Sequence, residues 1–166
     1  MAFAIYVSHD QHSAFKNWHQ LMQVAIDEAK LAAREGETPV GAVLVDHSSK
    51  EVISQAHNEC VSKHDPTAHA EIVALRKAAQ HRRNYRLKDT VLIVTLEPCI
   101  MCLGAIFHAR ISGLIFGARD HKAGAVISRL DINDLHWINH RIWYMDGILA
   151  HECSELLSSF FMEKRF

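Results

Sequence analysis

The sequence lacks long apolar runs, internal repeats and low-complexity segments, and only four of its 166 residues are cysteine. This cysteine content fits a reducing, cytoplasmic setting better than the disulfide framework of a secreted protein. No stretch approaches the run of about eighteen uncharged apolar residues that spans a bilayer, and we expect no membrane association. Because 49% of the residues are apolar, residues 1–166 are expected to form one packed domain.

The sequence also lacks the basic net charge of many nucleic-acid-binding proteins, since its formal charge is −1 at pH 7. The charge is nevertheless uneven: residues 76–129 contain ten lysines and arginines but three acids, so this segment carries +7 and the remainder −8. A local basic patch attracts phosphate without making the whole protein basic, and we expect one around the cysteines of this segment. The alternative is a solvated helix face and loop, which suits the dense cluster at 82–86 best.

Histidine and cysteine occur in two short motifs, His69-Ala70-Glu71 and Pro98-Cys99-Ile100-Met101-Cys102. One imidazole and two thiolates are good zinc ligands. Three protein ligands also leave tetrahedral zinc with one open position for water, as in catalytic sites. Cys99 and Cys102 are three residues apart, which places them on one face of a helix. The motifs therefore predict a catalytic zinc site.

Prolines mark the expected starts of the two helices that carry these ligands. Pro98 suits the first position of a helix, which puts both cysteines in a first turn where the helix dipole favours thiolates. Asp65 and Pro66 similarly predict a capping residue and a helix start just ahead of His69. His69 and Glu71 are two residues apart and do not share a helix face, so Glu71 is predicted to neighbour the zinc-bound water without being a ligand.

Two other interpretations of the cysteine motif remain open. A Cys-x-x-Cys pair can be a redox pair, although this gives no role to His69 or Glu71. A closed structural zinc site needs a fourth ligand, which Cys60, His64 or Cys153 could provide, but it too leaves the carboxylate without a role. Cys60 and Cys153 are expected to be small buried apolar residues instead.

Hydrophobic periodicity predicts alternating helices and strands. A first helix is expected to end near residue 36, because its apolar residues recur at intervals of three and four: Phe15, Trp18, Met22, Ala25, Ala29 and Ala32. Apolar runs predict strands at 40–45, 52–56, 91–96, 114–116 and 142–145, and further helices carry the two motifs and span about 151–161. This order predicts an α/β fold, a three-layer α/β/α arrangement with helices on both faces of a mixed five-stranded sheet. Ligands of such sheets collect at the carboxyl ends of the strands, where the metal motifs are placed.

With these motifs, the sequence resembles the bacterial tRNA adenosine deaminases, which have the cytidine deaminase-like fold. The resemblance covers about residues 15–162. It rests on the blocks at 38–43, 64–71, 84–87, 94–102 and 116–120 and on the pair Phe160-Phe161. The H-x-E…P-C-x-x-C pattern alone is shared by several deaminase families, whereas the longer Glu-Pro-Cys and Gly-Ala-Arg-Asp blocks are more specific.

The resemblance implies hydrolysis of adenosine to inosine at the wobble position of a tRNA anticodon. It implies that one zinc ion per subunit is held by His69, Cys99 and Cys102, and that Glu71 moves protons. The residues implied to contact the substrate are Asn58, Arg119, Asp120, Phe160 and Phe161. The family acts as a homodimer on the tRNA anticodon stem-loop, and we expect the same here. Glu59, which follows Asn58, departs from the family pattern by placing an acid near incoming phosphates.

Three other functions fit parts of this pattern. A guanine deaminase of the same fold shares the Asp-Pro-Thr-Ala-His-Ala-Glu block and the run at 101–106. A free base, however, does not require the Phe-Gly-Ala-Arg-Asp segment or the basic residues at 76–129. The same argument disfavours a cytosine-nucleotide deaminase. An inactive zinc-binding subunit that presents tRNA to a partner should have lost its proton-moving carboxylate, yet Glu71 is present.

Overall fold

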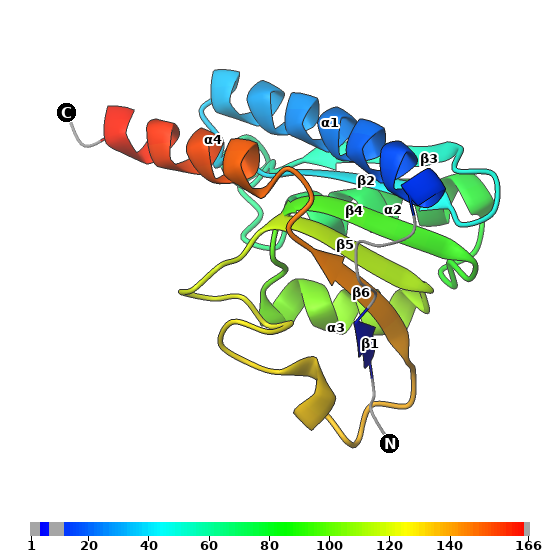
Figure 1. Ribbon diagram of the computed structural model, residues 1–166. Helices are drawn as coiled ribbons and strands as arrows, with labels where there is room; N and C mark the ends of the chain where they lie inside the picture. The colour runs from blue at the N-terminus through cyan, green and yellow to red at the C-terminus, as the bar shows by residue number, and fades with distance from the viewer. Residues whose placement is uncertain (1–3, 7–11, 165–166) are drawn as a thin grey trace.

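The computed structural model describes residues 4–6 and 12–164, with side chains from residue 17 onward. Figure 1 shows the strands and helices within these ranges. In chain order they are β1 (Ala4–Tyr6), α1 (His12–Arg34), β2 (Gly41–Asp46), β3 (Val52–His57), α2 (Ala70–Arg82), β4 (Thr90–Leu96), α3 (Ile100–Ala109), β5 (Gly113–Ala118), the 3-10 helix η1 (Ile132–Asp134), β6 (Ile142–Asp146) and α4 (Ala150–Glu163).

The strands form one mixed sheet in the order β1-β6-β5-β4-β2-β3. Strands β1, β6, β5 and β4 run parallel to one another, whereas β2 is antiparallel to both β4 and β3. Helices α1 and α4 cover one face of the sheet, and α2 and α3 cover the other (Figure 1). The predicted three-layer α/β/α fold is therefore confirmed.

The sheet has one strand more than the five predicted from the sequence. The predicted strands are present as β2 to β6, and β1 adds a sixth by pairing in parallel with the first three residues of β6. Strand β1 has only three residues. A segment this short cannot show the alternation of apolar and polar residues on which sequence-based assignment depends, so it was not predicted.

The central strands are almost uniformly apolar because both of their faces are covered. Val91 and Ile93 of β4 pack with residues of α1 and α4. Leu92 and Val94, which alternate with them, pack with residues of α2 and α3. Burying each such side chain contributes about 1.5–3 kcal/mol, so β4 fixes both helical layers and the loop that follows it.

The apolar stripe predicted for the first helix is buried in α1. Its described members are Trp18, Met22, Ala25, Ala29 and Ala32, and all of them are at most 4% exposed. The side chain of Phe15 lies outside the described side chains. Although α1 has 23 residues, neither it nor any other described helix is apolar enough over a sufficient length to cross a membrane.

Helix α2 begins later than its upstream proline suggests. It starts at Ala70, not just after Pro66, and His69 is its N-cap. Asp65 does not cap the helix, because its carboxylate accepts a hydrogen bond from the Thr67 amide at 2.8 Å and closes a local turn. The predicted capping role of Asp65 is therefore wrong, and the histidine lies at the helix boundary itself.

Helix α3 also begins later than predicted. It starts at Ile100 with Cys99 as its N-cap, so Pro98 precedes the cap and does not occupy the first helical position. The Pro98 carbonyl accepts a hydrogen bond from the Ala125 amide at 2.8 Å, and Cys99 forms an isolated antiparallel bridge with Gly124. These strand-like contacts hold Pro98 and Cys99 in extended backbone and delay the helix until the next residue.

Gly41, at the start of β2, lies where α1 approaches the sheet most closely. A Cβ atom there would overlap backbone atoms of Ala25 and Ala29 in α1. We therefore expect Gly41→Ala to lower the free energy of unfolding by about 1–3 kcal/mol, as overpacking does. In the control variant Gly104→Ala, the added methyl group meets no atom within 4 Å. Replacing a helical glycine there should raise stability by about 0.5–1 kcal/mol. Urea unfolding measures both effects, and equal stabilities would contradict this account of the close approach.

Candidate metal centre

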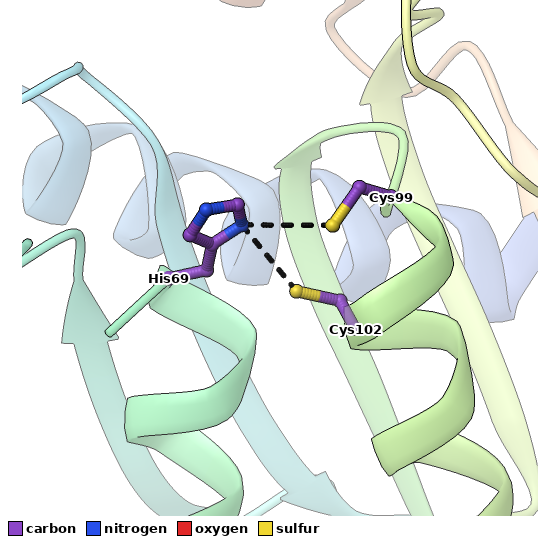
Figure 2. A group of neighbouring side chains, drawn as sticks. All are labelled: His69, Cys99 and Cys102. Atoms are coloured by element: carbon purple, nitrogen blue, oxygen red, sulfur yellow. Dashed lines mark hydrogen bonds between the residues drawn. The ribbon is translucent and has the colours of Figure 1, made fainter. Parts of the chain in front are cut away.

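The two motifs meet where the N-termini of α2 and α3 lie side by side (Figure 2). His69 caps α2, Cys99 caps α3, and Cys102 lies in the first turn of α3. The His69 Nδ1 atom lies 3.7 Å from the Cys99 Sγ atom and 3.6 Å from the Cys102 Sγ atom. All three potential ligand atoms lie within 4.8 Å of one another. The fold thus brings together residues that are up to 33 positions apart in the chain.

These distances fit a tetrahedral zinc ion. With Zn–N bonds of about 2.0–2.1 Å and Zn–S bonds of about 2.3 Å, tetrahedral angles place the nitrogen about 3.6 Å from each sulfur. Among the described residues, the cluster has three members and does not include Cys60, His64 or Cys153, which the closed-site interpretation requires. Three ligands leave a fourth position for water, as in catalytic zinc sites.

Shared hydrogen bonds favour the ionised form of Cys99 in this cluster. The pKa of Cys99 is lowered to about 3, chiefly because Cys102 donates a hydrogen bond to its thiolate, with a further contribution from His69. The pKa of Cys102 is raised, because its thiol is the donor in that bond and because it is buried. The pKa of His69 is raised, mainly by its hydrogen bond with Cys99. A divalent cation can replace the protons shared by these groups, and thiolate with imidazole ligation favours zinc.

Glu71 lies in the first turn of α2 and is 4% exposed. Burial raises the pKa of its carboxyl group to about 7. It is not a member of the three-residue metal cluster. A carboxyl group that titrates near neutrality can both accept and return a proton, which is the property required of a general acid–base catalyst.

Asn58, one residue beyond β3, supplies the cap that α2 does not receive from its own N-cap residue. Its Oδ1 atom accepts a hydrogen bond from the Ala70 amide at 2.8 Å, whereas the His69 side chain makes no capping hydrogen bond. The Asn58 side chain is buried, so its carboxamide is held in place through this oxygen. This arrangement leaves the two N–H groups of the carboxamide as donors beside the metal cluster.

Glu97, between β4 and the cysteine motif, holds the segment that follows β5. Its carboxylate accepts hydrogen bonds from four backbone N–H groups, those of Asp120, Val126, Ile127 and Ser128. The Ser128 hydroxyl donates a further hydrogen bond to it. Burial opposes ionisation of this carboxyl group, but the hydrogen bonds from Ile127 and Ser128 prevail and hold its pKa below the usual range. One side chain thereby fastens residues 120–128 against the metal motif.

Glu37 plays the corresponding part for the loop between β3 and α2. Its buried carboxylate accepts hydrogen bonds from the amides of Val61 and Ser62 at 2.9 and 2.8 Å. Burial opposes its ionisation, and these hydrogen bonds lower its pKa nonetheless. In the same loop Lys63 forms an ion pair with Glu59 at 2.5 Å. The negative charge of Glu59, the residue that departs from the family pattern, is therefore balanced by a neighbouring cation.

Neither buried glutamate was predicted from the sequence to have a role. Glu37 follows the end of α1 and has no motif around it. Glu97 carried a usable signal, because an acid between a largely apolar strand and a metal-binding motif is placed where burial is expected and therefore needs several hydrogen-bond donors. Both residues shape the loops around the metal cluster and do not contribute ligands to it.

Arg119 and Asp120 follow β5, the strand next to the one that leads into the cysteine motif. Because β4 and β5 are parallel, both residues lie at the same edge of the sheet as Cys99. The Arg119 Nε atom donates a hydrogen bond to Asp146 at 2.7 Å. The Asp120 carboxylate accepts hydrogen bonds from the two amides at 122 and 123. Their contact with substrate remains a prediction.

Phe160 and Phe161 form an edge-to-face pair near the end of α4, with ring centroids 5.5 Å apart. Phe160 is buried and Phe161 is 48% exposed. Lys164 lies over the Phe160 ring and donates a hydrogen bond to the Gly36 carbonyl just beyond α1. Lys164 thus connects the end of α4 to the end of α1. The contact of the phenylalanine pair with RNA remains a prediction.

The prediction of a single basic surface around the cysteines is wrong in its location. Arg119 lies at the metal edge of the sheet, but Arg82, Arg86 and Lys88 lie between the end of α2 and the start of β4. Helix α2 runs away from His69, and its 13 residues span about 20 Å. The densest part of the basic segment therefore lies at the opposite edge of the sheet. Its residues are close in sequence to the metal motif but far from it in space, because the full length of a helix separates them.

Several known proteins with similar sequences or folds are deaminases. Residues 16–118 match a family model described as the cytidine and deoxycytidylate deaminase zinc-binding region. The tRNA-specific adenosine deaminase of Haemophilus influenzae is 49% identical over 146 residues, which cover 88% of this chain and 84% of the relative. The zinc-binding model and the three-ligand cluster together identify zinc as the cofactor.

Two solved structures extend this comparison. One, from a study of A-to-I editing by tRNA:A34 deaminases at the wobble position, is 39% identical with a TM-score of 0.80 and covers 83% of this chain and 99% of that chain. A guanine deaminase from Nitrosomonas europaea has a TM-score of 0.76 and covers 86% of this chain and 83% of that chain. Its identity is 21%, so it shows a shared fold alone.

Glu97→Gln should loosen the segment that Glu97 holds. A carboxamide keeps one acceptor oxygen but turns an NH₂ group toward backbone donors, so buried N–H groups lose partners at about 1–3 kcal/mol each. We expect hydrogen exchange at Val126, Ile127 and Ser128 to become faster, while the zinc content stays at one ion per chain. Exchange followed by mass spectrometry, with the exposed Glu163→Gln variant as a control, makes the measurement. Unchanged exchange at 126–128 would show that Glu97 does not hold this segment.

Proposed function

The chain belongs to the cytidine and deoxycytidylate deaminase family, among its tRNA-specific adenosine deaminases, and we propose that it hydrolyses adenosine to inosine at the wobble position of a tRNA anticodon. Water replaces the exocyclic amine, and ammonia leaves. The observation that carries this proposal is the buried Glu71 carboxyl beside an open three-ligand zinc cluster in a chain 49% identical to a tRNA-specific adenosine deaminase.

We assign the zinc to His69, Cys99 and Cys102, one ion per subunit. When bound, zinc supplies a water molecule whose pKa is low enough for ionisation near neutral pH. With zinc in place, Glu71 would accept one proton of the attacking water as the water oxygen adds to C6 of adenine. Glu71 would pass that proton to the adjacent purine ring nitrogen, then take the remaining proton of the added hydroxyl and give it to the exocyclic amine, which leaves as ammonia. Its pKa of about 7 suits both directions of transfer.

Asn58 is proposed to orient the base. Its Oδ1 atom is committed to the Ala70 amide, so its N–H groups are the donors available to a ring nitrogen or carbonyl of the bound nucleobase. Arg119, Asp120 and the pair Phe160-Phe161 are proposed to contact the surrounding RNA. An unpaired anticodon base is the least costly to extrude into such a site, because it needs no base pair broken.

An exposed apolar groove between α2 and α3 supports a homodimer. The groove has a volume of about 310 Å³, and its lining includes Ile72, Leu75, Tyr85 and Leu87. Tyr85 is 66% exposed, which is unusual for an aromatic side chain beside a hydrophobic surface. A second copy of the chain is the proposed occupant, and the cytoplasm, where tRNA is used, is the proposed location.

A guanine deaminase remains the second candidate, because a known guanine deaminase has the same fold. The test is inosine formation on an anticodon stem-loop with adenosine at the wobble position, run beside free guanine and free cytidine. Inosine from the stem-loop alone is expected. Activity on guanine alone would reject the RNA substrate while retaining the roles of zinc and Glu71.

Different substitutions should affect proton transfer and metal binding independently. Glu71→Gln keeps all three zinc ligands, so we expect full zinc content with turnover lowered about a hundredfold or more. Cys99→Ala should lose zinc, whereas Cys153→Ala, which removes a buried thiol outside the cluster, should retain it. Zinc content is measured by elemental analysis beside the inosine assay. Normal turnover in the Glu71 variant would refute its assigned role.

A further inference from the structure

The cations of the basic segment line a groove at the edge of the sheet opposite the metal. Two adjoining cavities of about 460 and 480 Å³ share Arg86 and Lys88 and so form one depression, which we call the far-edge groove. Its lining includes Arg82, Arg86, Lys88, Asp89, Arg110 and His140. These residues come from the segments that precede β4, β5 and β6.

The far-edge groove is separate from the metal centre. Its residues precede the parallel strands, whereas Cys99 and Asp120 follow them. Strand β4 has seven residues and spans about 23 Å, which sets the distance between the two edges of the sheet. A base bound at the zinc cluster therefore cannot reach the groove, and the groove needs a role of its own.

Positive charge in the groove is largely unpaired. Arg82 pairs with Asp46 at 3.3 Å. Arg86, Lys88 and Arg110 take part in none of the ion pairs found between described residues. A chain with a net charge of −1 that gathers unpaired cations in one depression offers a local binding site for an anion.

The side chains of the groove also suit phosphate groups in their geometry. The Arg86 guanidinium lies over the exposed Tyr85 ring, 5.3 Å from its centroid, and the Arg110 Nη1 atom donates a hydrogen bond to the Asn139 carbonyl at 3.0 Å. Both guanidinium groups are thus oriented before any ligand arrives. Their planar forks match phosphate oxygens, and Lys88 adds a point charge in the same depression.

We propose that the far-edge groove binds phosphate groups of the RNA backbone outside the anticodon stem-loop, as a second contact for the substrate remote from the metal. The identity of that RNA as tRNA rests on the proposed function. The groove supplies affinity without sequence information, because phosphate contacts position a nucleic acid and do not read its bases.

Charge reversal at the groove tests this proposal. Arg86→Glu and Lys88→Glu change exposed side chains, and Lys30→Glu on α1 makes the same change of charge at an exposed lysine that pairs with Asp27. In zinc-loaded protein, the two groove variants should weaken binding of full-length tRNA several-fold, with KM raised and kcat kept. The slope of log affinity against log salt should become shallower by about one for each phosphate that the protein no longer neutralises. Lys30→Glu should leave both unchanged.

Removing a negative charge from the groove provides a second test. Asp89 is the one carboxylate among the described residues that line the groove, and its backbone has a φ of 59°. Asparagine tolerates this left-handed conformation, so Asp89→Asn removes the charge with little effect on the backbone. It should tighten tRNA binding, which a general loss of folding cannot do.

The outcomes separate the groove from the proposed function. Groove variants that match Lys30→Glu in affinity and salt slope would overturn the groove proposal. An equal weakening on the isolated stem-loop would overturn the placement of the contact outside the stem-loop. If the protein binds tRNA and groove variants weaken that binding, but no inosine forms, the deaminase proposal fails and the groove stands.

Discussion

The meeting of two helix N-termini at one metal site constrains most of the structure around it. His69 and Cys99 are N-cap residues, yet neither side chain caps its helix, because both point to the metal cluster. A missing cap costs a helix about 0.5–2 kcal/mol. Asn58 offsets part of this cost for α2 by accepting the Ala70 N–H from outside the helix. Zinc binding then contributes far more than two missing caps cost, so the metal and the fold are energetically coupled.

The loops around this site are irregular, and their backbone donors need partners that strands and helices cannot provide. Glu97 satisfies four N–H groups from the segment after β5, and Glu37 satisfies two in the loop after β3. A carboxylate is suited to this because two oxygens accept several hydrogen bonds, and each bond to a charged acceptor is stronger than one to a neutral acceptor. Apolar residues at these positions would leave buried N–H groups unpaired. The loops around the site are therefore held by two buried carboxylates whose oxygens accept hydrogen bonds from the backbone.

The features that the sequence predicts well are those set by the periodicity of apolar residues and by the spacing of the metal ligands. The run at 91–96 is largely apolar because both faces of β4 are covered, and the spacing of Cys99 and Cys102 places them at the N-cap and in the first turn of α3. The prolines predicted helix starts a few residues too early, because Pro66 lies in a turn closed by Asp65. The dense cations at 82–88 could not be placed without the direction and length of α2. Long-range partners such as those of Glu97 lie 23 to 31 residues away, beyond any local pattern.

The separation between the two edges of the sheet also decides how the far-edge groove can act. At physiological ionic strength the Debye length is about 8 Å, and the edges are about 23 Å apart, so the groove cations do not shift charge at the metal centre through the solvent. The protonation of Glu71 is instead governed by its own burial and its neighbours His69 and Cys99. Any effect of the groove on catalysis must therefore pass through bound RNA, as a change in how tightly or in what orientation the substrate is held. A chain of near-neutral net charge can therefore act on a polyanion, because the cations that bind RNA and the groups that carry out the chemistry lie in separate parts of the molecule.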